Sequence, residues 1–202
     1  AGKAERQYLW TMLGEYYLRL QEVEQTRRMW RMVAEADENN AGIRLKLFDL
    51  ARQVGDEMAM LEVLADVERL SGKYSSEWKY VEASRLVWQV RNDVVDKDAL
   101  ARASKLLKEA GQQRPEWQEV VILQAEIASL EADVERTIEL LQQSLKLGSP
   151  NPATIRRLVE LLIAYRRDNE AEEAMGFLET SWRPPWADKI QATFELKRGN
   201  KE

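Results

Sequence analysis

The chain has 202 residues, 45% hydrophobic and 32% charged, and its 9 Gly and 5 Pro are few enough to favour α-helix throughout. The formal net charge of −5 leaves no basic excess to neutralise phosphates, which argues against nucleic-acid binding. Because the chain has no Cys and no His, it excludes disulfides, zinc sites with thiolate or imidazole ligands, cysteine nucleophiles and Ser-His-Asp triads.

The first predicted element is a helix around Trp10. Trp10, Leu13 and Tyr17 are spaced i, i+3 and i+7, so they share one face of a helix. Gly14 lies beside them, and a missing side chain at that point allows a second helix backbone to approach closely. The pattern therefore predicts a helix that packs tightly against a neighbour.

A second apolar stripe begins at Trp30 and Val33 after a polar corner, and the stretch closes with Asp37-Glu38-Asn39-Asn40. The order W-x2-L-G-x2-Y, the aromatic residue in the second helix and the D-P-N-N-like end resemble the tetratricopeptide (TPR) repeat, a 34-residue helical hairpin. Glu38 stands where the family usually has proline, and Thr26 stands where it usually has alanine. The resemblance implies an all-α, right-handed α-solenoid.

A 34-residue period divides the chain into about five TPR-like helix-turn-helix units and a terminal helix, within a single repeat domain over 1–202. Phe48 stands where the repeat prefers a small residue, so either the helices separate there or the ring turns into the next interface. The predicted units are 7–40, 41–74, 75–117 with an insertion, 118–151 and 152–185, and the terminal helix spans 186–198.

The third unit is longer than the period, and two registers remain open for its first helix. One register is built on Trp78 and Trp88, and the other on Tyr80 and Ala83, which places small residues where the repeat prefers them. We expect the surplus residues in a longer first helix and in the corner 92–96. A repeat array accommodates such an insertion because each unit contacts only its neighbours.

The resemblance also implies a binding surface, because the first helix of each TPR unit lines a concave face that holds a peptide or a partner helix. Acidic residues recur at one repeat position of that face, which favours a partner with Lys or Arg, at about 0–1 kcal/mol per exposed pair. The alternative is an ordinary solvated surface. The ten candidate residues, called here the first-helix surface, are Tyr8, Thr11, Glu15, Leu45, Asp49, Arg52, Ile122, Glu126, Arg156 and Glu160.

One TPR subclass clamps a C-terminal carboxylate with Lys and Asn on these helices. Thr11 and Glu15 occupy those positions in the first unit, and Leu45 and Asp49 occupy them in the second. A carboxylate would meet repulsion from the two acids, so we do not expect binding of that kind.

Tryptophans outside the regular repeat positions are candidate interface residues, because exposed aromatic side chains dominate binding energetics. Trp78 and Trp88 lie on the irregular third unit, and Trp182 and Trp186 flank a Pro-Pro corner. Two outcomes are equally compatible with the sequence: at least one of these four tryptophans is exposed, or all four are buried.

Catalysis finds no support in the sequence, because there is no glycine-rich phosphate loop and the acidic residues follow regular helix-surface or corner patterns. We predict a scaffold or adaptor without enzymatic activity, metal or cofactor, whose partner is a protein or peptide of unknown identity. Three alternatives stay open: a regulatory or substrate-recruiting segment of a larger enzyme or envelope protein, an RNA-binding pentatricopeptide-like array, and self-association through an exposed solenoid end. The acidic balance argues against RNA.

The sequence predicts no membrane insertion, because it has no run of about 18 apolar residues. We expect it to be a piece of a longer protein, since the repeat pattern begins almost at once and stops within a partial unit. The compartment is not identified: the cytosol is favoured, and a bacterial envelope stays open, because both suit a chain without Cys.

Overall fold

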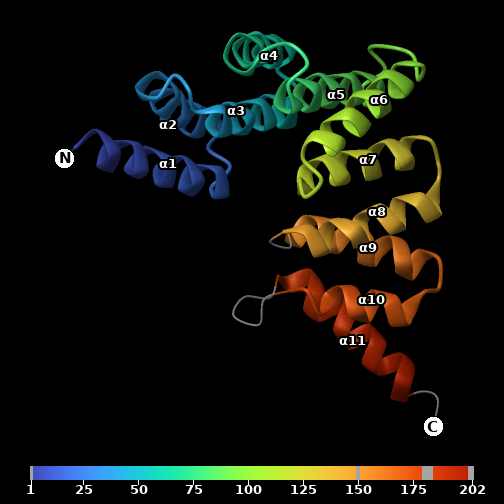
Figure 1. The fold of residues 1–202 in the computed structure, drawn as a ribbon. Coiled ribbons are helices and arrows are strands. Elements are labelled where there is room, and N and C mark those ends of the chain that lie inside the picture. The colour runs from blue at the N-terminus through green and yellow to red at the C-terminus, as the bar shows by residue number, and fades with distance from the viewer. Residues whose placement is uncertain (1, 149–150, 179–183, 200–202) are drawn as a thin grey trace. The chain divides into compact units, whose positions relative to one another are not determined.

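The computed structural model describes residues 2–148, 151–178 and 184–199. The described residues form eleven α-helices and no strand, which confirms the all-α prediction. Figure 1 shows these helices: α1 (Lys3–Arg19), α2 (Val23–Ala36), α3 (Ala41–Val54), α4 (Glu57–Ser71), α5 (Ser76–Arg91), α6 (Ala99–Gln113), α7 (Gln118–Leu130), α8 (Val134–Leu147), α9 (Pro152–Ala164), α10 (Asp168–Met175) and α11 (Pro185–Gly199).

Successive helices pack in pairs, so the described residues form five helical hairpins followed by α11, which contacts α10. Within residues 1–113, α2 packs on α3 and α4 packs on α5, and within residues 114–202 α8 packs on α9, so neighbouring hairpins of one range stack through the second helix of the earlier one. This stacking is the predicted α-solenoid. The chain divides into two compact units, Ala1–Gln113 with α1 to α6 (unit 1) and Arg114–Glu202 with α7 to α11 (unit 2).

Side-chain caps fix where many of the helices begin, because a helix N-terminus leaves backbone N–H groups without intrahelical partners. In each of these caps a side-chain oxygen accepts a hydrogen bond of 2.8–3.1 Å from a backbone N–H two or three residues later. The corner between α3 and α4 is closed by Gly55, whose φ of 75° lies in the left-handed region that favours glycine. The capping residues are Asn40, Asp56, Ser75, Asp133 and Asn151.

Gly14 marks the closest approach within the first hairpin. It is buried on α1, and a Cβ at this position would overlap the indole of Trp30, whose Cε2 would lie 3.1 Å away and whose Nε1 and Cδ1 would lie closer still. The close approach is therefore made by a side chain of α2, and not by its backbone as the sequence suggested. Trp30 itself is 3% exposed and forms a core with Val33, Ile43 and Leu50.

The third hairpin is irregular in its first helix and its corner. Helix α5 has 16 residues, and a seven-residue corner over 92–98 joins it to α6, whereas three residues separate α7 from α8. Trp78, Tyr80 and Ala83 are buried and Trp88 is half-buried, so neither predicted register of α5 faces solvent, because this helix packs against α3, α4 and α6. Phe48 on α3 is fully buried as well.

The tryptophans proposed as interface residues are not exposed where the structure describes them. Trp78 is 6% exposed, Trp88 is half-buried, and Trp186 is half-buried against the core of unit 2. Trp182 lies outside the described residues.

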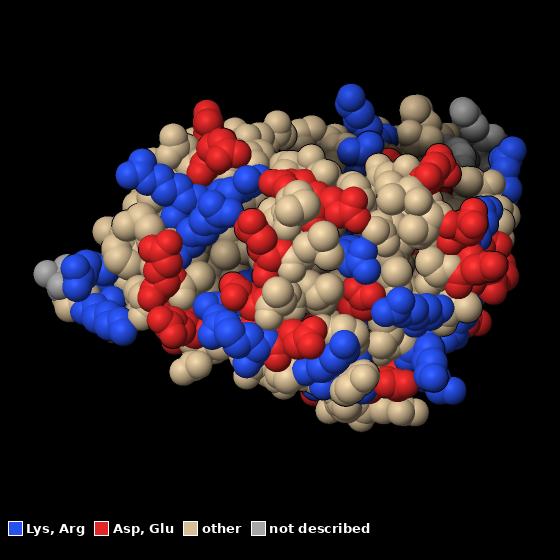
Figure 2. Space-filling view, turned by 90° about the horizontal axis from the view of Figure 1, so that it is seen from above, with Lys and Arg blue, Asp and Glu red and all other residues tan. Residues whose placement is uncertain are grey.

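The core of unit 2 is a continuous apolar cluster that runs from α7 to α11. It includes Val121, Leu141, Leu158, Met175 and Phe194, each less than a tenth exposed. Acidic and basic side chains are interspersed on the face shown in Figure 2. Within the described ranges, no helix is both long enough and apolar enough to cross a bilayer.

Candidate functional site

In unit 1 the first-helix surface lies on α1 and α3, and its acidic groups already have basic neighbours. Glu15 on α1 pairs with the ammonium of Lys46 on α3. Asp49 lies 4.0 Å from the Nε of Arg52, one turn along α3. Tyr8 is 69% exposed, whereas Leu45 is half-buried. These pairs offset much of the negative potential that a basic partner would meet.

Thr11 contributes little to this surface. Its hydroxyl donates a hydrogen bond of 2.9 Å to the carbonyl oxygen of Gln7 within the same helix, and its side chain is half-buried. A Thr hydroxyl bonded back to its own helix is a common local arrangement that needs no ligand.

In unit 2 the predicted residues lie on α7 and α9, and they differ in exposure. Glu126 is only 6% exposed, so it lies on a buried face of α7 and is not part of a solvated stripe. Ile122 is half-buried beside it. Arg156 and Glu160 form an exposed ion pair of 2.7 Å one turn apart on α9. The ten residues thus fall into two sets, one in each unit.

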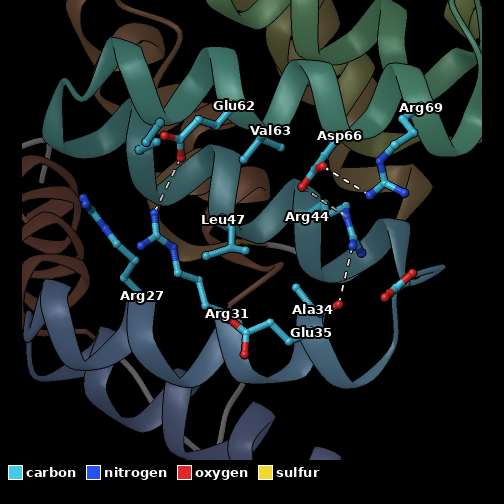
Figure 3. A pocket seen from close by; sticks show the side chains of 13 residues that line it. Arg27, Arg31, Ala34, Glu35, Arg44, Leu47, Glu62, Val63, Asp66 and Arg69 are labelled. Carbon is cyan, nitrogen blue, oxygen red and sulfur yellow. Dashed lines mark hydrogen bonds and ion pairs between the residues drawn. The ribbon is translucent and has the colours of Figure 1, made fainter.

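Unit 1 contains a groove that the sequence did not predict. It lies between α2 and α4 and has a volume of about 700 Å³, with Leu47 of α3 at its floor (Figure 3). Ala51, also on α3, lines it as well. Ala34 of α2 and Ala59 and Val63 of α4 line its sides. No member of the first-helix surface lines it. We call this hollow the α2–α4 groove.

The rim of the α2–α4 groove carries charges of both signs. Arg27 of α2 lies 3.1 Å from Asp56, the N-cap residue of α4, and Arg31 lies 3.7 Å from Glu62 across the groove. Glu35 and Glu38 also line it, both exposed, and neither forms an ion pair with any described residue. The rim therefore presents two solvated carboxylates beside an apolar floor.

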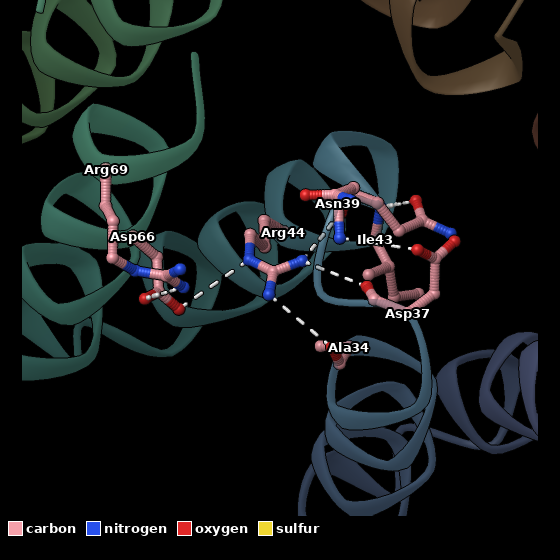
Figure 4. Close-up of polar contacts among 8 residues, drawn as sticks. Ala34, Asp37, Asn39, Ile43, Arg44, Asp66 and Arg69 are labelled. Carbon is pink, nitrogen blue, oxygen red and sulfur yellow. Dashed lines mark hydrogen bonds and ion pairs between the residues drawn. The ribbon is translucent and has the colours of Figure 1, made fainter. Parts of the chain in front are cut away.

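Arg44 joins the three helices of the groove. It is 4% exposed, and its Nη1 and Nη2 donate to the carbonyl oxygens of Asn40 (3.0 Å), Asp37 (3.4 Å) and Ala34 (3.4 Å), at or just beyond the end of α2 (Figure 4). The carbonyls of Ala34 and Asp37 lie at the C-terminal end of α2, where a cation suits the negative end of the helix dipole, and the Asn40 carbonyl lies at the start of α3. Its Nε lies 3.7 Å from Asp66 of α4 and makes no hydrogen bond to a described residue.

Arg44 could have been found from the sequence, because it follows Trp10 by one 34-residue period. A charged residue at a position that holds a core aromatic in the first unit signals a buried, bonded guanidinium. The groove itself had no such signal, because it depends on how far α2 and α4 stand apart.

A second charged cluster lies in unit 2, where Arg167 precedes α10. Its guanidinium contacts Glu170 and Glu135, each at 2.7 Å, and the amide of Gln142 donates to Glu170 at 3.0 Å. The hydrogen bonds from Arg167 and Gln142 lower the pKa of the Glu170 carboxyl, and the same pairing raises the pKa of Arg167. Ion-pair networks of this kind shift pKa values without catalysis. Across the described ranges, no cluster of three acidic side chains suits a metal ion.

Solved structures with this arrangement of helices come from several proteins. TTC0263, a thermophilic TPR protein of Thermus thermophilus, superposes with a TM-score of 0.66 at 17% identity, over 84% of this chain and 88% of that one. The chain has the tetratricopeptide-repeat fold. PilF of Pseudomonas aeruginosa gives a TM-score of 0.56 at 18% identity, over 98% and 88% of the two chains.

Acl4, an assembly chaperone of RpL4, gives a TM-score of 0.51 at 19% identity, over 95% of this TPR chain and 83% of the Acl4 chain. No protein-family model and no curated protein matches the sequence. At these identities the similarity shows the fold alone.

Proposed function

We propose that this TPR chain is a non-catalytic scaffold that holds a polypeptide segment of a protein partner in the α2–α4 groove. The observation that carries the proposal is the groove itself, with its apolar floor at Leu47 under a rim of charged side chains. Eight of the residues that line the groove are charged and five are apolar, so it offers a partner segment both an apolar contact and several ionic contacts. Acl4, which shares the fold, is by its description the chaperone of another protein.

The chemistry of the groove defines the partner segment. Burial of one Leu-sized side chain on the floor contributes about 1.5–3 kcal/mol, whereas each exposed ion pair at the rim contributes about 0–1 kcal/mol. The apolar floor therefore contributes most of the affinity, and the charged rim determines which segments are preferred. Because Glu35 and Glu38 have no cation among the described residues, the preferred segment carries a Lys or Arg next to its apolar anchor.

The first-helix surface remains a second location for the same function. In unit 1 its acids are paired with Lys46 and Arg52, which weakens the expected attraction for a basic partner. Both surfaces can be tested together, because Glu15 and Asp49 lie outside the groove.

The experiment selects peptides from a displayed random library against the wild-type chain and measures their affinity for variants. Ala59→Trp fills the groove, and Glu35→Lys with Glu38→Lys reverses its rim. We expect each to weaken the selected peptides at least about tenfold, a difference of about 1.4 kcal/mol. Ala101→Trp, the same substitution at an exposed position of α6, is the matched control and should leave affinity unchanged.

The double variant Glu15→Lys with Asp49→Lys separates the two surfaces. Loss of affinity in this variant alone would move the site to the first-helix surface and contradict the groove. Equal affinity across all variants, or a library that yields no peptide, would contradict both. Circular dichroism of each variant checks that the helices are intact.

A further inference from the structure

Helix α1 is apolar on two faces, and only one of them is packed. Trp10 and Leu18 lie against the core shared with α2, where Gly14 admits the Trp30 ring. The opposite face carries large apolar side chains that are half or more exposed: Tyr8 (69%), Leu9 (54%), Met12 (50%), Tyr16 (57%) and Leu20 (54%) at the C-cap. A contiguous group of exposed apolar side chains is typical of an interaction surface.

The later first helices of unit 1 show what such a second face packs against. Helix α3 packs against both α2 and α4, and α5 packs against α3, α4 and α6. The extensive packing of α1 is with α2 (Figure 1). The exposed face of α1 therefore has the composition of a helix–helix interface without the second helix.

The exposed face of α1 is nearly symmetric about Met12. Tyr8 and Tyr16 lie four residues to either side, and Glu5 and Arg19 lie seven residues to either side. At about 100° per residue, Glu5 and Arg19 stand within about 20° of Met12 around the helix, and the two tyrosines within about 40°. Glu5 and Arg19 are exposed, and no described residue forms an ion pair with either.

We propose that this face binds a second copy of the chain, with α1 antiparallel to its counterpart and Met12 on a two-fold axis. A two-fold interface brings the same patch of both copies together, so residue i of one meets residue j of the other and the reverse. Antiparallel pairing about Met12 stacks each Tyr8 beside Tyr16 of the other copy. It also places each Glu5 opposite Arg19 of the other copy, which makes two complementary ion pairs.

The charges select this arrangement over its competitor. In parallel pairing Glu5 would meet Glu5 and Arg19 would meet Arg19, which repel. A crossing near 20°, the geometry of coiled coils and four-helix bundles, keeps residues one heptad apart in line along both helices. The contact is one helix of 17 residues, roughly 25 Å long. Stable interfaces bury about 1,200–2,000 Å², so a single pair of helices makes a weak, concentration-dependent dimer.

Charge exchange tests the pairing. Sedimentation equilibrium from about 5 to about 200 µM should show the wild-type mass rise towards twice the monomer mass, a range suited to weak association. Glu5→Arg alone and Arg19→Glu alone should each remain monomeric, because each creates two like-charge contacts. An equimolar mixture of the two variants should associate, because in the mixed pair both contacts become attractive again.

Replacing Glu5 also removes the hydrogen bond that its carboxylate accepts from the Gly2 N–H, which weakens the start of α1. Association of the mixture would show that the Glu5→Arg variant still folds, so its monomeric state when alone would not be a folding artefact. Met12→Lys should abolish association by placing two ammonium groups on the axis. Arg6→Glu, the same charge change as Arg19→Glu but off the face, is the matched control and should associate like the wild type. A monomeric wild type, or a mixture no more associated than its components, would overturn the proposal.

Discussion

Unit 1 and unit 2 stabilise the same kind of hairpin stack with different interiors. Three charged side chains of unit 1, Arg44, Lys79 and Glu82, are less than a tenth exposed, whereas Glu126 is the buried charged residue among the described residues of unit 2. The regular, short-cornered hairpins of unit 2 enclose a continuous apolar cluster. Where the period breaks at α5, ion pairs take over part of the packing. Apolar contacts set the distance between two helices, whereas ion pairs between them also set how the helices are oriented.

The ion pairs of α5 hold it against its neighbours. Glu82 accepts from Arg85 at 3.0 and 3.2 Å within α5 and from Arg102 of α6 at 2.9 Å. Lys79 reaches Glu109 of α6 at 3.1 Å. A buried charge tolerates few alternative packings, because leaving it unpaired is costly. These contacts therefore select one orientation of α5 on α6.

The largest expected effect is the loss of Glu82. Glu82→Leu leaves Arg85 without its main partner, and removing one member of a buried pair costs about 3–5 kcal/mol. We expect the low end, about 3 kcal/mol, because Arg85 keeps Glu57 at 3.8 Å and Arg102 is exposed. Urea unfolding measures the change, and hydrogen exchange should place the loss of protection in unit 1.

Two further variants sharpen this contrast. Glu82→Leu combined with Arg85→Met should recover most of the loss, because replacing both partners by apolar groups is often neutral. Glu160→Gln in unit 2 removes an exposed ion pair and should cost at most about 0.5 kcal/mol. Equal effects of Glu82→Leu and Glu160→Gln would show that burial does not distinguish the two units.

Two glycines give the next largest difference. A Cβ at Gly14 would overlap the buried Trp30 indole, whereas a Cβ at Gly148 of unit 2 would meet the Oε1 of Gln118 at 2.6 Å. Gly14→Ala should lower stability by about 1–2 kcal/mol, even after the roughly 1 kcal/mol by which a helix prefers alanine, because the Trp30 ring is only 3% exposed. Gly148→Ala should cost less than about 0.5 kcal/mol, because the flexible Gln118 side chain can rotate away.

Thermal unfolding of the two alanine variants measures this pair. A stability of Gly14→Ala equal to that of the wild type would mean that Trp30 moves freely, and the tight first hairpin would be wrong. A large loss for Gly148→Ala would instead show that the hydrogen bond from Gln118 to the Ser144 carbonyl, 2.9 Å long, matters more than the space around it.

The fold was predictable because it depends on the spacing of apolar residues that are close together in the sequence. Trp10, Leu13 and Tyr17 define a helix face, and a 34-residue period carries the pattern forward. The same period does not determine which residues are exposed, so the first-helix surface stays a prediction. Glu126 shares its position with the accessible Glu15, yet it is buried. Exposure depends on which neighbouring helices cover a position, which a single sequence does not state.

The smallest expected effect comes from the Arg167 cluster, and it is lost in acid. The hydrogen bonds from Arg167 and Gln142 lower the pKa of Glu170 in the folded chain, so the unfolded chain binds a proton first as the pH falls. The stabilisation is therefore complete above the unfolded pKa of about 4.3 and is lost as the pH falls through the lower folded value. Glu170→Gln should be less stable than the wild type at pH 7, by an amount that shrinks below about pH 4. Urea unfolding at several pH values measures this difference, and one that stays constant into acid would contradict the assignment to Glu170.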